Sequence, residues 1–146
     1  MIDPAYCQLL ARYNRWMNER IYAAADELGE AARVLDRGAF FGSIHRTLSH
    51  LVWGDRIWLA RFTGTRYGER AYGADLYRDF ATLARDRDAT DTALLDWAGN
   101  VTQEWLASTF RYHRSSDGKD VDITATEDEL SAAGPSSMKR EPRSLI

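Results

Sequence analysis

The sequence predicts an all-α protein in which long amphipathic helices pack as an antiparallel bundle. Apolar side chains recur at steps of three and four residues in three segments, residues 6–28, 41–62 and 76–98. Short connections join these segments, and such connections are typical of helices that lie antiparallel to their neighbours. At 146 residues, of which 45% are hydrophobic, the chain is long enough for one core but too short for two.

The first helix is predicted from its start signal and its apolar spacing. Asp3 can cap the helix with its carboxylate, and Pro4 suits the first turn, where a backbone N–H is not needed. Helical spacing then continues for about six turns through Tyr6, Leu9, Leu10, Tyr13, Trp16, Met17, Ile21, Ala24 and Leu28. Gly29 suits the left-handed conformation that ends many helices. Aromatic side chains on this stripe could line a pocket, but such a stripe more often belongs to a core.

The second helix has the strongest core pattern, with one acidic exception. Its stripe consists of Phe41, Ile44, Leu48, Leu51, Asp55, Trp58 and Phe62. Asp55 is therefore expected on or beside a buried face, where an unpaired carboxylate is costly. Arg56, Arg61 or a polar group of the first helix such as Asn14 could pair with it. His50 should project along the flank of the same stripe.

The segments on either side of the second helix are predicted to be irregular. Residues 30–39 contain Gly38 and no clear stripe, so they are expected to form a connection. Ser43 is a candidate cap for the second helix, although Phe41 could already lie inside it. Residues 65–74 hold two glycines and two tyrosines and are expected to form a loop packed by its tyrosines.

The third helix is predicted at residues 76–98, and its middle differs from its ends. Residues 85–91 are almost wholly charged and polar, so we expect one long helix with a solvated middle. A break near Asp88 is the alternative.

Beyond the third helix the sequence predicts shorter elements and then a tail. A short helical turn is expected after Thr102, an extended segment at residues 108–112 and a hairpin-like turn at residues 115–118. The large apolar residues that follow are sparse and two prolines interrupt them: Ile123, Leu130, Pro135, Met138, Pro142, Leu145 and Ile146. We therefore predict a helical domain at residues 1–119 and a polar, disordered tail at residues 120–146.

Three long helices leave a question of what covers their apolar faces. A bundle normally has a fourth helix, and the tail does not supply an amphipathic helix of useful length. Either the tail docks poorly on the bundle, or a second copy of the chain completes the core, or apolar surface stays exposed and the protein aggregates.

Composition and charge exclude several classes of protein. The formal charge is −3, and basic residues alternate with acidic ones, so no basic face for nucleic acid is expected. No apolar run approaches the roughly 20 residues that span a bilayer, and the N-terminus does not begin like a signal peptide. Cys7 is the single cysteine, which rules out a disulfide within the chain. A cytoplasmic protein is the default expectation.

Several segments resemble one protein family. YNRWMNERIYAAADEL at residues 13–28, GSIHRTLSHLVWGDRIWLARFTG at residues 42–64, and WL followed by FRYHRSSDGK at residues 110–119 resemble the DinB/YfiT-like family of bacterial helical proteins. The resemblance implies an up-down-down-up four-helix bundle, often a homodimer. It also implies a divalent metal, zinc or nickel, held by three histidines. Better-known relatives are thiol-dependent transferases or isomerases that use bacillithiol or mycothiol.

The resemblance places the first metal ligand of the family at His50. The other two family ligands form a His-xxx-His pair on the fourth helix, and this sequence contains no such pair. The fourth helix is therefore missing or replaced by the polar tail, and a frameshift or a truncated reading frame is one explanation. His45 lies about 140° around the helix from His50, so the two cannot easily share one ion. His113 could approach only through the tertiary structure.

Two functions follow as hypotheses. The first is a divalent-metal-dependent transferase or hydrolase, with a low-molecular-weight thiol or another small molecule as substrate and His50 as the one recognisable ligand of an incomplete site. The second is a catalytically silent remnant of the bundle, or a binding module without metal. From the residues alone a single histidine at a helix margin is more often structural than a ligand, and open zinc sites generally use three protein ligands.

Overall fold

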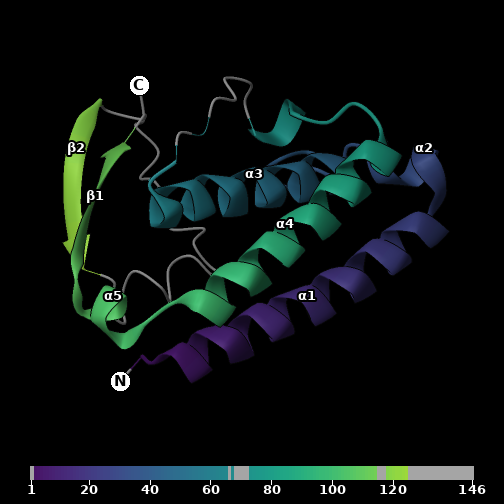
Figure 1. Ribbon diagram of the computed structural model, residues 1–146. Helices are drawn as coiled ribbons and strands as arrows, with labels where there is room; N and C mark the ends of the chain where they lie inside the picture. The colour runs from purple at the N-terminus through teal and green to yellow at the C-terminus, as the bar shows by residue number, and fades with distance from the viewer. Residues whose placement is uncertain (1, 66, 68–72, 115–117, 125–146) are drawn as a thin grey trace.

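The computed structural model describes residues 2–65, 67, 73–114 and 118–124 (Figure 1). The long helices in this part of the chain are α1 (Pro4–Glu27), α3 (Ile44–Thr63) and α4 (Phe80–Asn100). The shorter elements are α2 (Gly29–Val34), the 3₁₀ turn η1 (Gly73–Asp75), α5 (Gln103–Ala107), and the strands β1 (Thr109–Arg114) and β2 (Lys119–Thr124). The described chain is therefore mostly helical, as predicted, and it contains a small two-stranded sheet in addition.

Helix α4 lies between the other two long helices and packs on both of them (Figure 1). Helix α1 runs antiparallel to α4, whereas α3 runs in the same general direction as α4. The four-helix bundle that the resemblance implies is not confirmed, because no fourth long helix occurs among the residues that the structure describes. Residues 125–146 of the predicted tail lie outside those residues, so the division into domain and tail stays a prediction.

Side-chain caps start the helices, at Asp3, Ser43 and Thr102 as the sequence suggests and at Asp79 where it does not. Asp3, Ser43, Asp79 and Thr102 each accept a hydrogen bond from the backbone N–H three residues later. Each bond satisfies an N–H of the first turn that has no partner within the helix. Ser43 rather than Phe41 marks the start of α3, since Phe41 lies outside the helix.

The predicted connection at residues 30–39 is partly wrong, because its first residues form α2. Gly29, at φ 75°, ends α1 in the left-handed conformation and lets the chain turn at once into α2. The Arg33 guanidinium then donates to the backbone carbonyls of Ala25 and Asp26 in the last turn of α1, at 3.0 and 3.1 Å. This buried side chain holds α2 against the end of α1. Because the contact is made by a charged residue, the spacing of apolar residues does not predict α2.

The prediction of a solvated middle for α4 is also wrong. The helix begins at Phe80, later than expected, and continues without a break through Asp88. Arg87 and Asp91, in the segment that we expected to face solvent, are both only 3% exposed. Because α4 packs between α1 and α3, it has two faces to bury rather than one.

The core divides into two clusters, one toward each end of the helices. At the end near α2, the buried residues are Ala25, Leu48, Val52, Tyr77 and Leu83. At the other end, they are Ile2, Cys7, Ala98 and Leu106, and the rings of Trp97, Trp105 and Phe110 pack against them. The stripe predicted on α3 is only partly buried, because η1 packs on a different side of that helix and buries Ser49.

The β-hairpin lies beyond the C-terminal ends of α3 and α4 (Figure 1). Strand β1 pairs antiparallel with β2, from Thr109 opposite Thr124 to Arg114 opposite Lys119, which confirms the predicted extended segment. The predicted turn falls mainly on residues 115–117, which lie outside the described residues. Tyr112 of β1 contacts the Trp58 ring of α3 and so ties the hairpin to the helices. None of the helices that the structure describes is long and apolar enough to cross a membrane.

Candidate functional site

His50 projects from α3 into an aromatic environment. Its ring stacks on that of Phe41 with the centroids 4.1 Å apart, and the Trp53 ring lies 5.1 Å away on the same helix. Burial lowers the pKa of His50, because removing water disfavours the charged imidazolium. The ring is therefore neutral at pH 7, and neutral imidazole is the form that binds metal.

The other two histidines of the chain are engaged elsewhere. His45 is buried, and its Nε2 donates a hydrogen bond to the backbone carbonyl of Tyr77 at 2.7 Å. His113 is exposed on β1, where its Nδ1 lies 3.0 Å from a carboxylate oxygen of Asp120. Each of these interactions uses one ring nitrogen, and together they turn the two rings toward different parts of the fold.

The residues present do not fit a centre of three imidazoles. The chain has three histidines in total, and they point to three different places. Within the described part of the chain, no three His, Cys, Asp or Glu side chains lie together in a way that could hold a metal ion. His50 as a metal ligand therefore stays a prediction. The tertiary structure does not bring His113 next to His50 as a second ligand.

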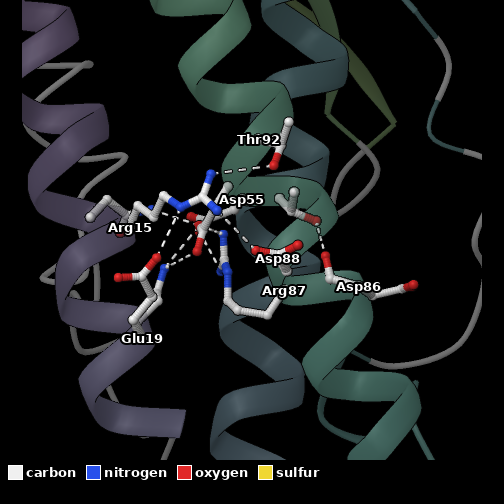
Figure 2. A network of polar contacts seen from close by, with 11 residues as sticks. Arg15, Glu19, Asp55, Asp86, Arg87, Asp88 and Thr92 are labelled. Carbon is white, nitrogen blue, oxygen red and sulfur yellow. Dashed lines mark hydrogen bonds and ion pairs between the residues drawn. The ribbon is translucent and has the colours of Figure 1, made fainter. Parts of the chain in front are cut away.

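A buried ion cluster joins the three long helices. The Arg87 guanidinium of α4 binds the carboxylate of Asp55 on α3 at 2.8 Å and that of Asp91 one turn further along α4 (Figure 2). The Asn18 amide of α1 donates to both oxygens of Asp91, at 3.0 and 3.2 Å, and the Asn14 amide donates to one of them at 3.3 Å. Every one of these side chains comes from a different turn, so the cluster holds the helices in register.

A second group of polar contacts joins α1 and α4 beside this cluster. Arg15 of α1 pairs with Glu19 on its own helix at 3.0 Å and with Asp88 of α4 at 3.2 Å (Figure 2). The same guanidinium reaches the Thr92 hydroxyl at 3.5 Å. These contacts are largely exposed, so each of them stabilises the fold much less than the bonds of Arg87 beneath them.

Two carboxylates share one guanidinium in the buried cluster. Burial raises the pKa of Asp55 and of Asp91, and the attraction of Arg87 acts in the opposite direction without overcoming it. Each carboxylate also raises the pKa of the other when it is charged, because like charges disfavour ionisation. The expected pairing of Asp55 with Asn14 contributes a hydrogen bond, but its main partner is Arg87, which sequence reasoning did not find.

A pocket of about 710 Å³ lies between α3 and α4. Small residues of both helices, Ala60, Ala89 and Ala93, leave space between the two backbones. The remaining lining combines apolar and polar side chains: Leu59, Thr63, Thr65, Tyr67, Thr90, Asp96, Trp97, Asn100, Arg56 and Asp86. The volume lies within the range of pockets that bind small organic molecules.

One side of this pocket carries a hydrogen-bonded group of three side chains. The Tyr77 hydroxyl donates to a carboxylate oxygen of Asp86 at 2.6 Å, and Arg56 donates to both of these oxygen atoms at 2.9 and 3.0 Å. Burial and the bond to Asp86 raise the pKa of Tyr77 to about 12, so the phenol stays protonated. This arrangement fixes the Arg56 guanidinium beside the pocket, where its remaining N–H groups can bind an oxygen of a ligand.

A comparison with models of known protein families identifies the family of this helical scaffold. The model of the DinB family matches residues 1–127. The chain belongs to the DinB family. No curated protein and no solved structure gives a significant match. The family expected from the helix segments is thereby confirmed, and the match covers every helix and strand of this DinB chain that the structure describes.

Sequence reasoning found His50 and Asp55 in this DinB chain but missed Arg87 and the pocket. Arg87 and Asp91 are four residues apart, a spacing that puts a basic and an acidic side chain on one helical face. That signal also fits an exposed pair, so it could not identify a buried one. The pocket depends on small residues from two helices that are distant in sequence, and no local pattern reveals it.

Replacing Arg87 by Met should destabilise the protein strongly. The change removes the shared cation and leaves the buried carboxylate of Asp91 and the half-buried carboxylate of Asp55 without it, which costs about 3–5 kcal/mol. Urea unfolding of the full chain measures the loss. Arg85→Met is the matched control on the exposed face of α4, where we expect a change within about 0.5 kcal/mol. Equal effects of the two substitutions would contradict the role assigned to Arg87.

The carboxyls of the cluster should titrate above the ordinary value for aspartate. Because folding raises the pKa of Asp55 and Asp91, the folded chain binds their protons more tightly than the unfolded chain does. Their contribution to the free energy of unfolding is fully present below pH 3.8 and is lost as pH rises through the folded pKa values. Carbon-13 NMR of the carboxyl groups measures these values directly.

Asp122 serves as the internal reference for this titration. Its pKa is lowered by the hydrogen bonds from Arg111 on the exposed hairpin. We therefore expect both cluster carboxyls to titrate at higher pH than Asp122. Midpoints for Asp55 and Asp91 at or below that of Asp122 would show that Arg87 outweighs burial.

Proposed function

We propose that this DinB-family chain is a binding module that takes a low-molecular-weight thiol, or a similar small polar molecule, in the pocket between α3 and α4 and holds no resident metal ion. The chemistry of the histidines carries the proposal. His45 lies against the Tyr77 carbonyl, His113 beside Asp120 and His50 on the Phe41 ring, so the three imidazoles of one chain do not converge on a single ion.

The α3–α4 pocket supports the binding role. Arg56 and Asp86 offer charged groups already held in place by Tyr77, so little ordering is needed when a ligand binds. Trp97 and the alanines offer an apolar surface for the rest of the molecule. A small molecule with both polar and apolar parts suits this lining better than an extended polymer.

A second candidate is a divalent-metal-dependent transferase or hydrolase, with zinc or nickel as the metal. The lowered pKa of His50 favours it, since a neutral imidazole is ready to act as a ligand. In that case the other ligands would have to come from outside the described residues, from a second copy of the chain or from a bound thiol. We derive no catalytic step through such a metal.

The metal content of the full chain separates the two candidates. Wild-type protein and the His50→Ala variant are dialysed, reloaded with zinc or nickel, dialysed again and analysed by mass spectrometry of the elements. We expect well below one metal ion per chain in both. Near-stoichiometric metal in the wild type that is lost in His50→Ala would contradict the proposal and support the metal-dependent enzyme.

NMR titration of the full chain with bacillithiol, and separately with mycothiol, tests binding to the pocket. We expect either thiol to shift the NMR signals of Arg56, Tyr67 and Trp97, since these residues line the pocket. Ala93→Trp should abolish the shifts because the indole fills the space between α3 and α4. Ala81→Trp is the matched control on α4 outside this pocket and should leave binding unchanged. Shifts that survive Ala93→Trp, or no shifts with either thiol, would overturn the assignment.

A further inference from the structure

A second pocket, of about 610 Å³, lies where the end of α1, helix α2 and the first turn of α4 meet (Figure 1). Its lining includes Tyr22 of α1, Val34 of α2 and Phe80 of α4, and the Tyr22 and Phe80 rings stack with their centroids 5.8 Å apart. These three side chains give this α1–α2 pocket an apolar wall. None of the described residues that line it belongs to the pocket between α3 and α4.

Arg33 supplies a buried positive charge to the α1–α2 pocket. It is only 9% exposed, and its guanidinium carbon lies 4.2 Å from the centre of the Phe80 ring. Its Nη1 atom makes the bonds to the carbonyls at the end of α1, whereas Nε and Nη2 bond to no residue that the structure describes. Neither of these two atoms is completely buried, so both are open to the pocket. The Nε–Nη2 edge of a guanidinium binds a carboxylate through two parallel hydrogen bonds.

His45 supplies a hydrogen-bond acceptor to the same pocket. It is 7% exposed and lies at the start of α3, where its Nε2 donates to the Tyr77 carbonyl. Since Nε2 carries the proton, Nδ1 of the neutral ring is an acceptor. No residue in the described ranges donates to Nδ1, and this atom is not completely buried either. A ligand with an N–H group can therefore bind there.

Carboxylates line this pocket as well. Glu30 of α2 and Asp26 of α1 are both exposed at its edge. Asp26 lies 3.8 Å from Nη1 of Arg33, but Glu30 forms no ion pair within the described part of the chain, although Arg33 is on the same short helix. The carboxylates would repel a purely anionic ligand, and Arg33 would repel a purely cationic one. The lining therefore favours a ligand that carries both charges.

We propose that the α1–α2 pocket binds a free α-amino acid with an apolar side chain. Its carboxylate pairs with the Nε–Nη2 edge of Arg33, and its ammonium group donates to Glu30 and to Nδ1 of His45. The apolar side chain lies against Tyr22 and Phe80. The proposal goes beyond the proposed function and is independent of it, because the two pockets share no lining residue among those described.

NMR titration of the full chain with L-phenylalanine, and separately with L-leucine, tests the proposal. We expect millimolar concentrations of either amino acid to shift the amide signals of Glu30, Arg33 and Phe80 and to leave those of Arg56 and Trp97 unchanged. No shifts with either amino acid would overturn the proposal. Shifts confined to Arg56 and Trp97 would equally overturn it, because the amino acid would then occupy the pocket between α3 and α4.

Two analogues of phenylalanine test the two charges of the ligand without altering the protein. Hydrocinnamate lacks the ammonium group, and phenethylamine lacks the carboxylate. We expect each analogue to bind roughly tenfold more weakly than phenylalanine, or weaker still, since each loses charge-assisted hydrogen bonds. An analogue that binds as tightly as phenylalanine would overturn the assignment of a zwitterionic ligand.

Glu30→Gln tests the contact with the ammonium group. This variant should bind phenylalanine roughly tenfold more weakly than the wild type does, whereas it should bind hydrocinnamate no more weakly. Glu27→Gln is the matched control, because Glu27 is exposed at the end of α1 and does not line the pocket. Equal effects of the two substitutions on phenylalanine binding would contradict the role given to Glu30.

Tryptophan at two neighbouring positions of α1 tests where the amino acid binds. Ala23 lines the pocket and Ala24 does not, and both are exposed, so circular dichroism should show unchanged helix content in both variants. Ala23→Trp should abolish the shifts caused by phenylalanine, because the indole occupies the pocket, and Ala24→Trp should leave them unchanged. Binding that survives Ala23→Trp, or that is lost equally in both variants, would place the amino acid elsewhere and overturn the proposal.

Discussion

The pairing of Arg87 with Asp55 and Asp91 is the interaction on which this structure depends most. One buried guanidinium from α4 reaches a carboxylate on α3, while the second carboxylate accepts amide hydrogen bonds from α1. Three helices must therefore adopt one mutual register for the charges to be satisfied, since any slip leaves a buried ion unpaired. Apolar packing alone would tolerate more variation than this polar arrangement does.

The ion cluster also explains where apolar surface is left over. The side of α1 that faces α4 supplies Asn14 and Asn18 to the cluster, so its large apolar residues lie mostly on the side that faces away. On the other side of α4, small residues leave the pocket beside Arg56 and Asp86. Helix α4 thus makes charged contacts with both neighbours, and its contact with α3 also leaves a pocket.

Membership of the DinB family describes the scaffold of this protein more than its chemistry. A fold can persist while its site changes, because helix packing depends on the buried residues and catalysis depends on a few side chains brought together. Here the neutral imidazole of His50 remains on α3, but His45 and His113 have other partners. The binding role that we propose uses the pocket beside Arg56 and Asp86, which Tyr77 holds in place.

The sequence by itself determined the start of α1, the candidate cap of α3, the extended segment of β1, the family and the acidic exception Asp55, because caps and helical spacing act within a few residues of the chain. Only the tertiary structure decided which faces are buried. The charged middle of α4 is buried because it lies between two helices, and the apolar stripe of α1 is exposed because α4 covers its other side. Burial depends on neighbours that are distant in sequence, so local patterns cannot specify it.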